Sequence, residues 1–260
     1  MIKSLLFASD LQIITALSLG YAATGVVLYW VFYGPTWRLR IEAFEGVVAP
    51  FALQASSIFA LTAGLLGFSV WGNFQANADS VGREAAAASA YIHLVDAVPT
   101  LREQGLLALA GNYLDLATGE EWAARMTRKQ SPRAKQAFSV LLTRSVEIAA
   151  RGDQPIAVSG LLARAIESWE TARLSRLSFI GATAEETRWI CVLLLGVFMQ
   201  GGWLMVHIGK PKPAALSLTA TTLVILVLLS LIALTVDPYK GLISISKAPL
   251  EAVLADLRTH

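Results

Sequence analysis

Polar residues recur on one face of a predicted helix that leaves a long apolar stretch. Asn73, Asn77, Ser80 and Glu84 are separated by four, three and four residues, the spacings that place side chains on the same side of an α-helix. If several copies of this helix surround an axis, these positions become rings of amides, hydroxyls and carboxylates. Rings of carboxylate favour cations in a pore, so Glu84 would favour a cation pathway.

A second interpretation of Glu84 involves pairing inside the protein. Charged side chains are seldom buried without a partner, and Arg173 and Arg176 lie three residues apart in a later predicted helix. An ion pair between Glu84 and these arginines would be structural, and removal of one partner would cost about 3–5 kcal/mol. The sequence leaves both interpretations open.

Further pore-lining candidates lie within the apolar stretch itself. Phe59 and Phe68 are candidates for hydrophobic constrictions that gate a pore by dewetting, although aromatic residues in a span also serve packing. Ser57 and Thr62 are the polar candidates, and each hydroxyl can instead bond to its own helix. Together with the polar face beyond the stretch, these residues form the predicted pore lining.

The sequence offers little for covalent chemistry. His93, His207 and His260 have no carboxylates or cysteines at metal-ligand spacing, so no metal site is predicted. The single cysteine, Cys191, excludes an intrachain disulfide. No Ser-His-Asp set and no phosphate-binding glycine loop is recognisable. We therefore predict no enzyme activity and no cofactor.

One long helix must position the candidates. Residues 51–71 are apolar over the roughly 20 residues that a bilayer crossing needs, and no proline follows before Pro99. An alanine-rich tract at 85–88 favours continuation of the helix. At about 1.5 Å per residue, a helix over residues 50–99 would measure on the order of 70 Å, so it would project from the membrane into water.

Composition indicates a membrane protein with a soluble insertion. Hydrophobic residues make up 55% of the chain and charged residues 15%, and most charges lie between the second and third apolar stretches. The net charge of +2 comes from interleaved acids and bases, which predicts no nucleic-acid partner. We predict an all-α membrane protein with four transmembrane helices and a helical cytoplasmic domain between the second and third.

The predicted domain boundaries follow these stretches. Residues 1–72 hold transmembrane helices 1 and 2, 73–184 the soluble helical bundle, 185–237 transmembrane helices 3 and 4, and 238–260 a tail with a short amphipathic helix. Within the bundle, apolar residues with a period near 3.6 predict helices at about 101–117 and 155–181. In the tail, Leu250, Val253, Leu254 and Leu257 share a face, which we expect to dock on the soluble helices.

Four spans place both termini and the insertion on the same side of the membrane. Basic residues near the spans include Lys3 and Arg83 on that side, against Arg38, Arg40, Lys210 and Lys212 on the other. The positive-inside rule then predicts a multi-pass protein of the cell inner membrane with cytoplasmic N- and C-termini.

Four stretches resemble the bestrophin-like domain family of bacterial membrane proteins, relatives of the bestrophin channels. They are Phe68-Ser-Val-Trp71 continuing through Arg83-Glu84-Ala85 to Leu101-Arg102, Tyr113 with Glu121-Trp122, Arg173-Leu-Ser-Arg176-Leu177 ahead of Trp189, and Asp237-Pro-Tyr-Lys-Gly241 with residues 244–250. They follow in the family's order and cover nearly the whole chain. The resemblance implies an architecture like that of bestrophins, pentameric channels whose second span lines a central pore.

The chain also departs from these patterns. Residues 183–185 replace a proline common before the family's third span, and Ala55 stands between Phe51 and Phe59 where bestrophins have a neck of three bulky residues. The acidic cluster that binds calcium in animal bestrophins has no counterpart, so calcium gating is not expected. The leading hypothesis is a homo-oligomeric, pentameric channel that conducts inorganic ions through the lipid bilayer. The alternative is a non-conducting membrane scaffold or signalling protein whose helical bundle binds a partner.

Overall fold

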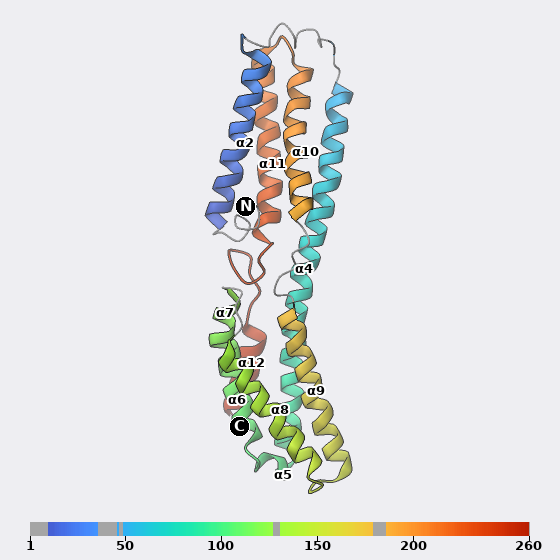
Figure 1. Ribbon diagram of the computed structural model, residues 1–260, viewed down its shortest axis with the longest axis vertical. Coiled ribbons are helices and arrows are strands. Elements are labelled where there is room, and N and C mark those ends of the chain that lie inside the picture. Colours follow the sequence, from blue (N-terminus) through green and yellow to red (C-terminus); the bar gives the residue numbers. More distant parts are fainter. Residues whose placement is uncertain (1–9, 36–45, 47–48, 127–130, 179–185, 260) are drawn as a thin grey trace. The chain divides into compact units, whose positions relative to one another are not determined.

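The computed structural model describes residues 10–35, 46, 49–126, 131–178 and 186–259. Lys3, Arg38, Arg40, the 183–185 stretch and His260 lie outside these residues. The described part is built from helices, and no strand occurs in it (Figure 1). The all-α prediction is therefore confirmed. Contacts divide the chain into two units, a membrane unit (Met1–Phe74 and Thr183–Ser244) and a helical unit (Gln75–Ala182 and Ile245–His260).

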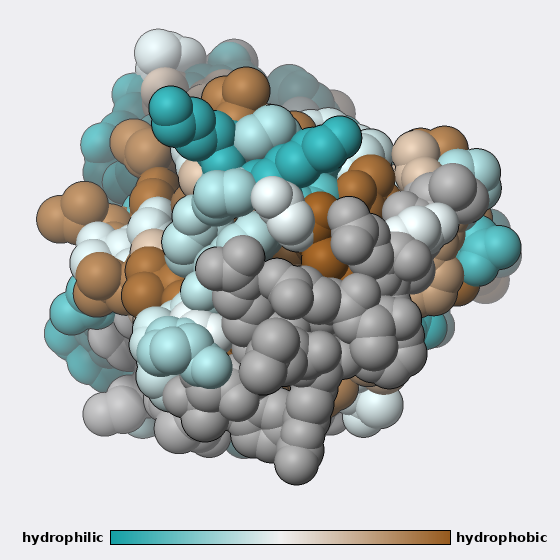
Figure 2. All heavy atoms as spheres, turned by 90° about the horizontal axis from the view of Figure 1, so that it is seen from above, coloured by the Kyte–Doolittle hydropathy of each residue, from teal (hydrophilic) through white to brown (hydrophobic). Residues whose placement is uncertain are grey.

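Four helices of the described chain are long and apolar enough to cross a membrane, as predicted. They are α2 (Asp10–Tyr33), α4 (Ala49–Ala97), α10 (Glu186–Val206) and α11 (Pro211–Leu234). Helix α11 packs against both α2 and α10 (Figure 1). The buried centre of this unit includes Ile13, Phe59, Leu66, Trp189 and Ile225. Large hydrophobic side chains of the unit, such as Leu65 and Phe198, are exposed, as expected for a surface that faces lipid. Figure 2 shows hydrophobic and polar side chains side by side at one end of the molecule.

The helical unit includes the second half of α4. Its other elements are α5 (Pro99–Arg102), α6 (Leu106–Leu116), the π-helical turn η1 (Ala117–Glu121), α7 (Trp122–Met126), α8 (Pro132–Ala150), α9 (Ile156–Ser178) and α12 (Ala248–Thr259). Helix α8 packs between α6 and α9 (Figure 1). Helix α12 docks on α6, with Leu250 and Leu254 buried, so the predicted docking of the tail is confirmed.

Two local differences from the predicted helices have physical causes. The helix predicted over 101–117 is interrupted, because Gly105 adopts a left-handed conformation with φ of 73° before α6 begins. The end of the same region forms η1, a turn with wider hydrogen bonding than an α-helix. The interruption ends α5 early, and η1 sets the direction of the acidic side chains Glu120 and Glu121.

Candidate functional site

Helix α4 has one exposed side and one buried side along its described length. One set of exposed residues follows at three- and four-residue intervals, which is the repeat of a single helix face, and further exposed residues such as Ile58 and Trp71 lie beside it. This exposed stripe comprises Gln54, Ser57, Leu61, Leu65, Phe68, Gly72, Gln75, Asp79, Arg83, Ala86, Ala90 and His93. The opposite side packs into the membrane unit through residues such as Ala63 and Leu66, and into the helical unit through residues such as Tyr91 and Val95.

The predicted pore-lining residues divide between these two sides. Ser57 and Phe68 belong to the exposed stripe, Asn73 is also exposed, and Thr62 is half-buried with its hydroxyl bonded to the Ile58 carbonyl at 2.7 Å. The remaining four, Phe59, Asn77, Ser80 and Glu84, are buried inside the chain. The polar face read from the sequence therefore points into the protein at three of its four positions.

Several polar residues of the exposed stripe were not among the candidates, and three of them share a spacing of four. Gln75 and Asp79 are exposed and stand four residues apart, with Arg83 a further four residues on. This spacing was visible in the sequence, and it competed with the spacing of Asn73, Asn77, Ser80 and Glu84. Only the packing of neighbouring helices distinguishes the two faces.

Glu84 belongs to a buried cluster of charges in the helical unit. Its carboxylate forms an ion pair with the Arg176 guanidinium, and both side chains are fully buried. Arg176 Nη2 also donates to Glu121 Oε2 at 2.6 Å, and Arg173 Nη2 donates to Glu121 Oε1 at 2.7 Å. Two carboxylates and two guanidinium groups therefore meet with no net formal charge, which offsets the cost of removing each from water.

Tyr113 joins the two halves of this charge cluster. Its hydroxyl donates to Glu84 Oε1 at 2.5 Å and accepts from Arg173 Nε at 3.0 Å. Burial raises the pKa of Tyr113 well above its usual value, and the negative charge of Glu84 raises it further. The phenol therefore remains protonated and keeps its role as a donor to Glu84.

The pKa of Arg176 is also shifted by its surroundings. Burial alone would lower its pKa, but Glu84, Tyr113 and Glu121 together more than offset this, and the pKa of Arg176 lies well above its ordinary value. Arg176 is therefore a permanent cation held at the centre of the unit. A fixed cation with two buried carboxylate partners is suited to holding helices together.

Each member of the cluster arrives on a different structural element, except for the two arginines. Glu84 comes from α4, Tyr113 from α6, Glu121 from η1, and Arg173 and Arg176 from consecutive turns of α9. The Arg173 guanidinium also lies over the Phe138 ring of α8, 5.1 Å from its centroid, a favourable cation–π arrangement. The cluster therefore connects five elements of the helical unit.

Sequence reasoning paired Glu84 with Arg173 and Arg176, and the structure brings all three together around shared partners. It missed Tyr113 and Glu121 as members of the same cluster. Both lie in a stretch that carries the family resemblance, which was the available signal. Arg83, the neighbour of Glu84, is exposed and lies outside the cluster.

The membrane unit has a neutral polar cluster around Gln200. The Gln200 side-chain amide donates to the Thr222 hydroxyl at 2.8 Å and to the Tyr21 carbonyl at 3.2 Å, and its oxygen accepts from the Thr24 hydroxyl at 3.0 Å. These bonds link α10 with α2 and α11. Interhelical hydrogen bonds of this kind hold membrane helices together.

Comparison with known proteins assigns this architecture to a class. The sequence profile of the Bestrophin-like domain matches residues 19–250. The chain belongs to the bestrophin-like domain family. No curated protein matches it.

Solved structures share the fold at low sequence identity. A tryptophan-to-alanine variant of a bacterial bestrophin homologue from Klebsiella pneumoniae has a TM-score of 0.71 and 11% identity, covering 97% of this chain and 98% of that chain. A leucine-to-threonine variant of the homologue has a TM-score of 0.69 and 11% identity, covering 95% and 98%. The chain therefore has a bestrophin-type fold over nearly its whole length.

Proposed function

We propose that this protein is a homo-oligomeric ion channel in which the exposed stripe of α4 lines the pore. The observation that carries the proposal is the stripe itself, which leaves one side of a 49-residue helix uncovered. Identical helices around an axis would cover this side while leaving a passage for inorganic ions. The family resemblance to bestrophins supports a pentamer with this helix innermost.

The composition of the stripe supports a pore with an apolar section and a charged section. Leu61, Leu65 and Phe68 provide apolar side chains in the part of α4 that belongs to the membrane unit, and such rings gate by dewetting. Asp79 and Arg83 follow in the helical unit. A ring of Asp79 favours cations and a ring of Arg83 favours anions, so their balance would set the selectivity.

The buried charge cluster has a supporting role in this proposal. It attaches the buried side of α4 to α9 through Glu84 and Arg176, which keeps Asp79 and Arg83 on the uncovered side. We further propose that the helical unit and both termini lie in the cytoplasm, with the four spans in the cell inner membrane.

The direct test is recording from purified protein in planar bilayers, with two matched phenylalanine variants. Phe68 on the stripe is 79% exposed and Phe198 on α10 is 70% exposed, so both can be shortened without opening a core. Phe68→Ala should raise the unitary conductance or the open probability, whereas Phe198→Ala should leave both unchanged. Equal effects of the two variants would show that the exposed stripe does not line the pore.

A charge test addresses selectivity in the same recordings. In a salt gradient, Asp79→Asn should shift the reversal potential toward anion selectivity, and Arg83→Gln should shift it toward cation selectivity. Lys135→Gln, an exposed position on α8, is the control and should leave the reversal potential unchanged.

A non-conducting scaffold is the competing function, and one observation favours it. Glu84, the carboxylate expected to form a charged ring, is fully buried and paired within one chain. A scaffold would use the exposed residues of the helical unit to bind a soluble partner. Well-folded oligomers that stay silent across salts and pH values would favour this function over the channel.

A further inference from the structure

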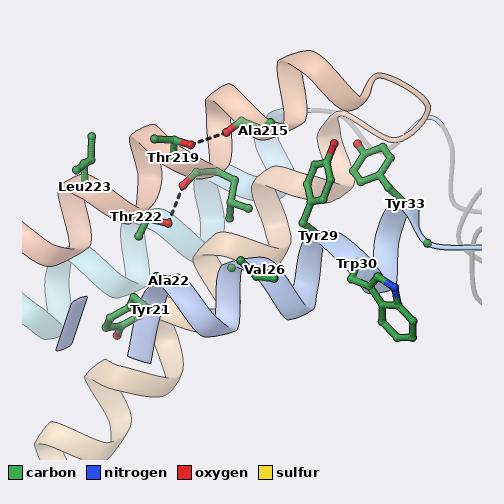
Figure 3. Close-up of a pocket in the computed structure, with 13 residues that line it drawn as sticks. Tyr21, Ala22, Val26, Tyr29, Trp30, Tyr33, Ala215, Thr219, Thr222 and Leu223 are labelled. Carbon is green, nitrogen blue, oxygen red and sulfur yellow. Dashed lines mark hydrogen bonds between the residues drawn. The ribbon is translucent and has the colours of Figure 1, made fainter. Parts of the chain in front are cut away.

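A groove of about 620 Å³ runs between α2 and α11 in the membrane unit (Figure 3). Its walls are mainly apolar and include Ala22, Val26, Leu218 and Leu223. The volume falls in the range of roughly 300–1,000 Å³ that is usual for sites holding an organic molecule. The groove shares Tyr21 and Thr222 with the polar cluster around Gln200, and it is separate from the buried charge cluster and from the exposed stripe of α4.

The threonine hydroxyls of the groove are already bonded within the protein. The hydroxyls of Thr219 and Thr222 donate to carbonyls of their own helix at 2.9 and 2.7 Å (Figure 3). The occupant of this part therefore needs to be apolar. On α2 the lining extends from Tyr21 to Gly34, about 20 Å at 1.5 Å per residue, which is long enough to cover one leaflet, about half of the roughly 30 Å hydrocarbon core.

One end of the groove has the character of a membrane interface. The rings of Tyr29 and Tyr33 lie 4.8 Å apart there (Figure 3), near the end of α2, and aromatic residues of this kind mark the headgroup level. Their hydroxyls donate to the carbonyls of Pro211 at 3.5 Å and His207 at 2.6 Å. The groove therefore ends at the turn that joins α10 to α11.

This turn carries two positive charges. Lys210 and Lys212 flank Pro211 and are both exposed. Beyond Lys212, the remainder of α11 has no charged residue, and Leu216, Leu223 and Val227 are exposed along it. The surface therefore combines an apolar groove, long enough to cover one leaflet, with basic groups at the polar end of the groove.

We propose that this groove binds an anionic phospholipid. One acyl chain lies between α2 and α11, and the phosphate group is held at Lys210 and Lys212. Basic groups at the ends of transmembrane helices attract anionic headgroups, and the apolar walls explain why a lipid binds there in preference to a soluble phosphate. The charge complementarity distinguishes this occupant from a helix of a second copy.

The test uses delipidated full-length protein in a zwitterionic detergent, titrated with phosphatidylglycerol or with phosphatidylcholine of the same acyl chains. Bound lipid is counted by native mass spectrometry. Phosphatidylglycerol should bind about tenfold more tightly than phosphatidylcholine, and Lys210→Gln/Lys212→Gln should remove this preference. Lys135→Gln/Arg151→Gln, which removes two exposed charges from the helical unit, should retain it.

A second variant tests the groove separately from the charges. Val26→Trp adds bulk to the groove wall and should weaken both lipids alike while both lysines remain. Equal binding of the two lipids to the unaltered protein would overturn the proposal, as would unchanged binding in both the lysine and the Val26→Trp variants. A Val26→Trp protein that loses subunits but keeps its lipid would assign the groove to a contact between copies.

Discussion

The two units solve the problem of buried polar groups in different ways. In the membrane unit, Gln200 makes neutral hydrogen bonds to threonine hydroxyls and a carbonyl. Thr222 also donates to the Leu218 carbonyl, and the Thr24 hydroxyl has the Tyr21 carbonyl as a second acceptor within reach. In the helical unit, Glu84 and Arg176 are full charges whose partners are themselves buried. In the membrane unit, the threonine hydroxyls still have a carbonyl to bond to when Gln200 is lost. In the helical unit, the loss of one charged side chain leaves its partner buried with less compensation. Loss of one residue should therefore have unequal consequences in the two units.

The largest effect is expected from Arg176→Met. The change leaves Glu84 and part of Glu121 buried without their cation, which should lower the free energy of unfolding by about 3–5 kcal/mol. Denaturant titration of the detergent-solubilised protein, followed by circular dichroism, measures it. The control is Arg144→Met, because Arg144 forms an exposed pair with Glu147 at 3.4 Å and such pairs contribute about 0–1 kcal/mol. Equal losses in the two variants would contradict the role of the cluster.

A double variant tests whether the cost lies in the unpaired charge. Glu84→Leu alone should be strongly destabilising, because it leaves Arg176 with less compensation. Arg176→Met combined with Glu84→Leu should cost clearly less than the sum of the single losses, since contacting charges are not additive. Strict additivity in the same titration would show that the two side chains do not act as a pair.

A smaller effect is expected in the membrane unit from Gln200→Leu. Thr24 and Thr222 keep their bonds to the Tyr21 and Leu218 carbonyls, at 3.1 and 2.7 Å, so no hydroxyl is left without a partner. The loss should be about 0.6–2 kcal/mol, as for other hydrogen bonds between membrane helices. A loss as large as that of Arg176→Met, in the same assay, would erase the contrast between the units.

Tyr91→Phe should have the smallest effect on stability at neutral pH, because the ionisation of Tyr91 changes the stability only in alkaline solution. Burial raises the pKa of Tyr91 from 10.0 to about 12, although its bond to Ser145 lowers it in part. Between these values the unfolded chain releases the proton and the folded chain keeps it, so stability falls as pH rises. Below pH 10 the contribution of Tyr91 to the stability of the folded state is fully present. Tyr91→Phe should flatten the decline of stability between pH 10 and 12; an unchanged slope would exclude Tyr91 as its source.

The sequence predicts the architecture of this protein well because length and hydrophobicity suffice for it. Helices α2, α10 and α11 are apolar over a full bilayer crossing, and the alanine-rich part of α4 has no residue that would end the helix. These are local properties. They do not depend on which helix becomes a neighbour.

The orientation of α4 is what the sequence could not supply. Gln75 and Asp79 form a polar face as plausible as Asn77 and Glu84, and helix periodicity alone favours neither. The choice is made by Arg176, which lies 92 residues beyond Glu84 in the chain. Glu121 was missed for a related reason: no local sequence pattern predicts the π-helical turn that directs its side chain to the arginines.

The turn η1 also decides which of two adjacent acids enters the interior. Glu120 accepts from the Ser131 hydroxyl at 2.6 Å and pairs with Arg133 at 3.0 Å, while Glu121 meets the arginines of α9. A π turn contains one residue more than the α turn that it replaces. Deleting one residue ahead of Glu120 would rotate the following side chains by about 100° and move Glu121 out of the position that faces the arginines. A deletion of one uncharged residue there would thus separate Glu121 from the arginines of α9, although every charged residue would still be present.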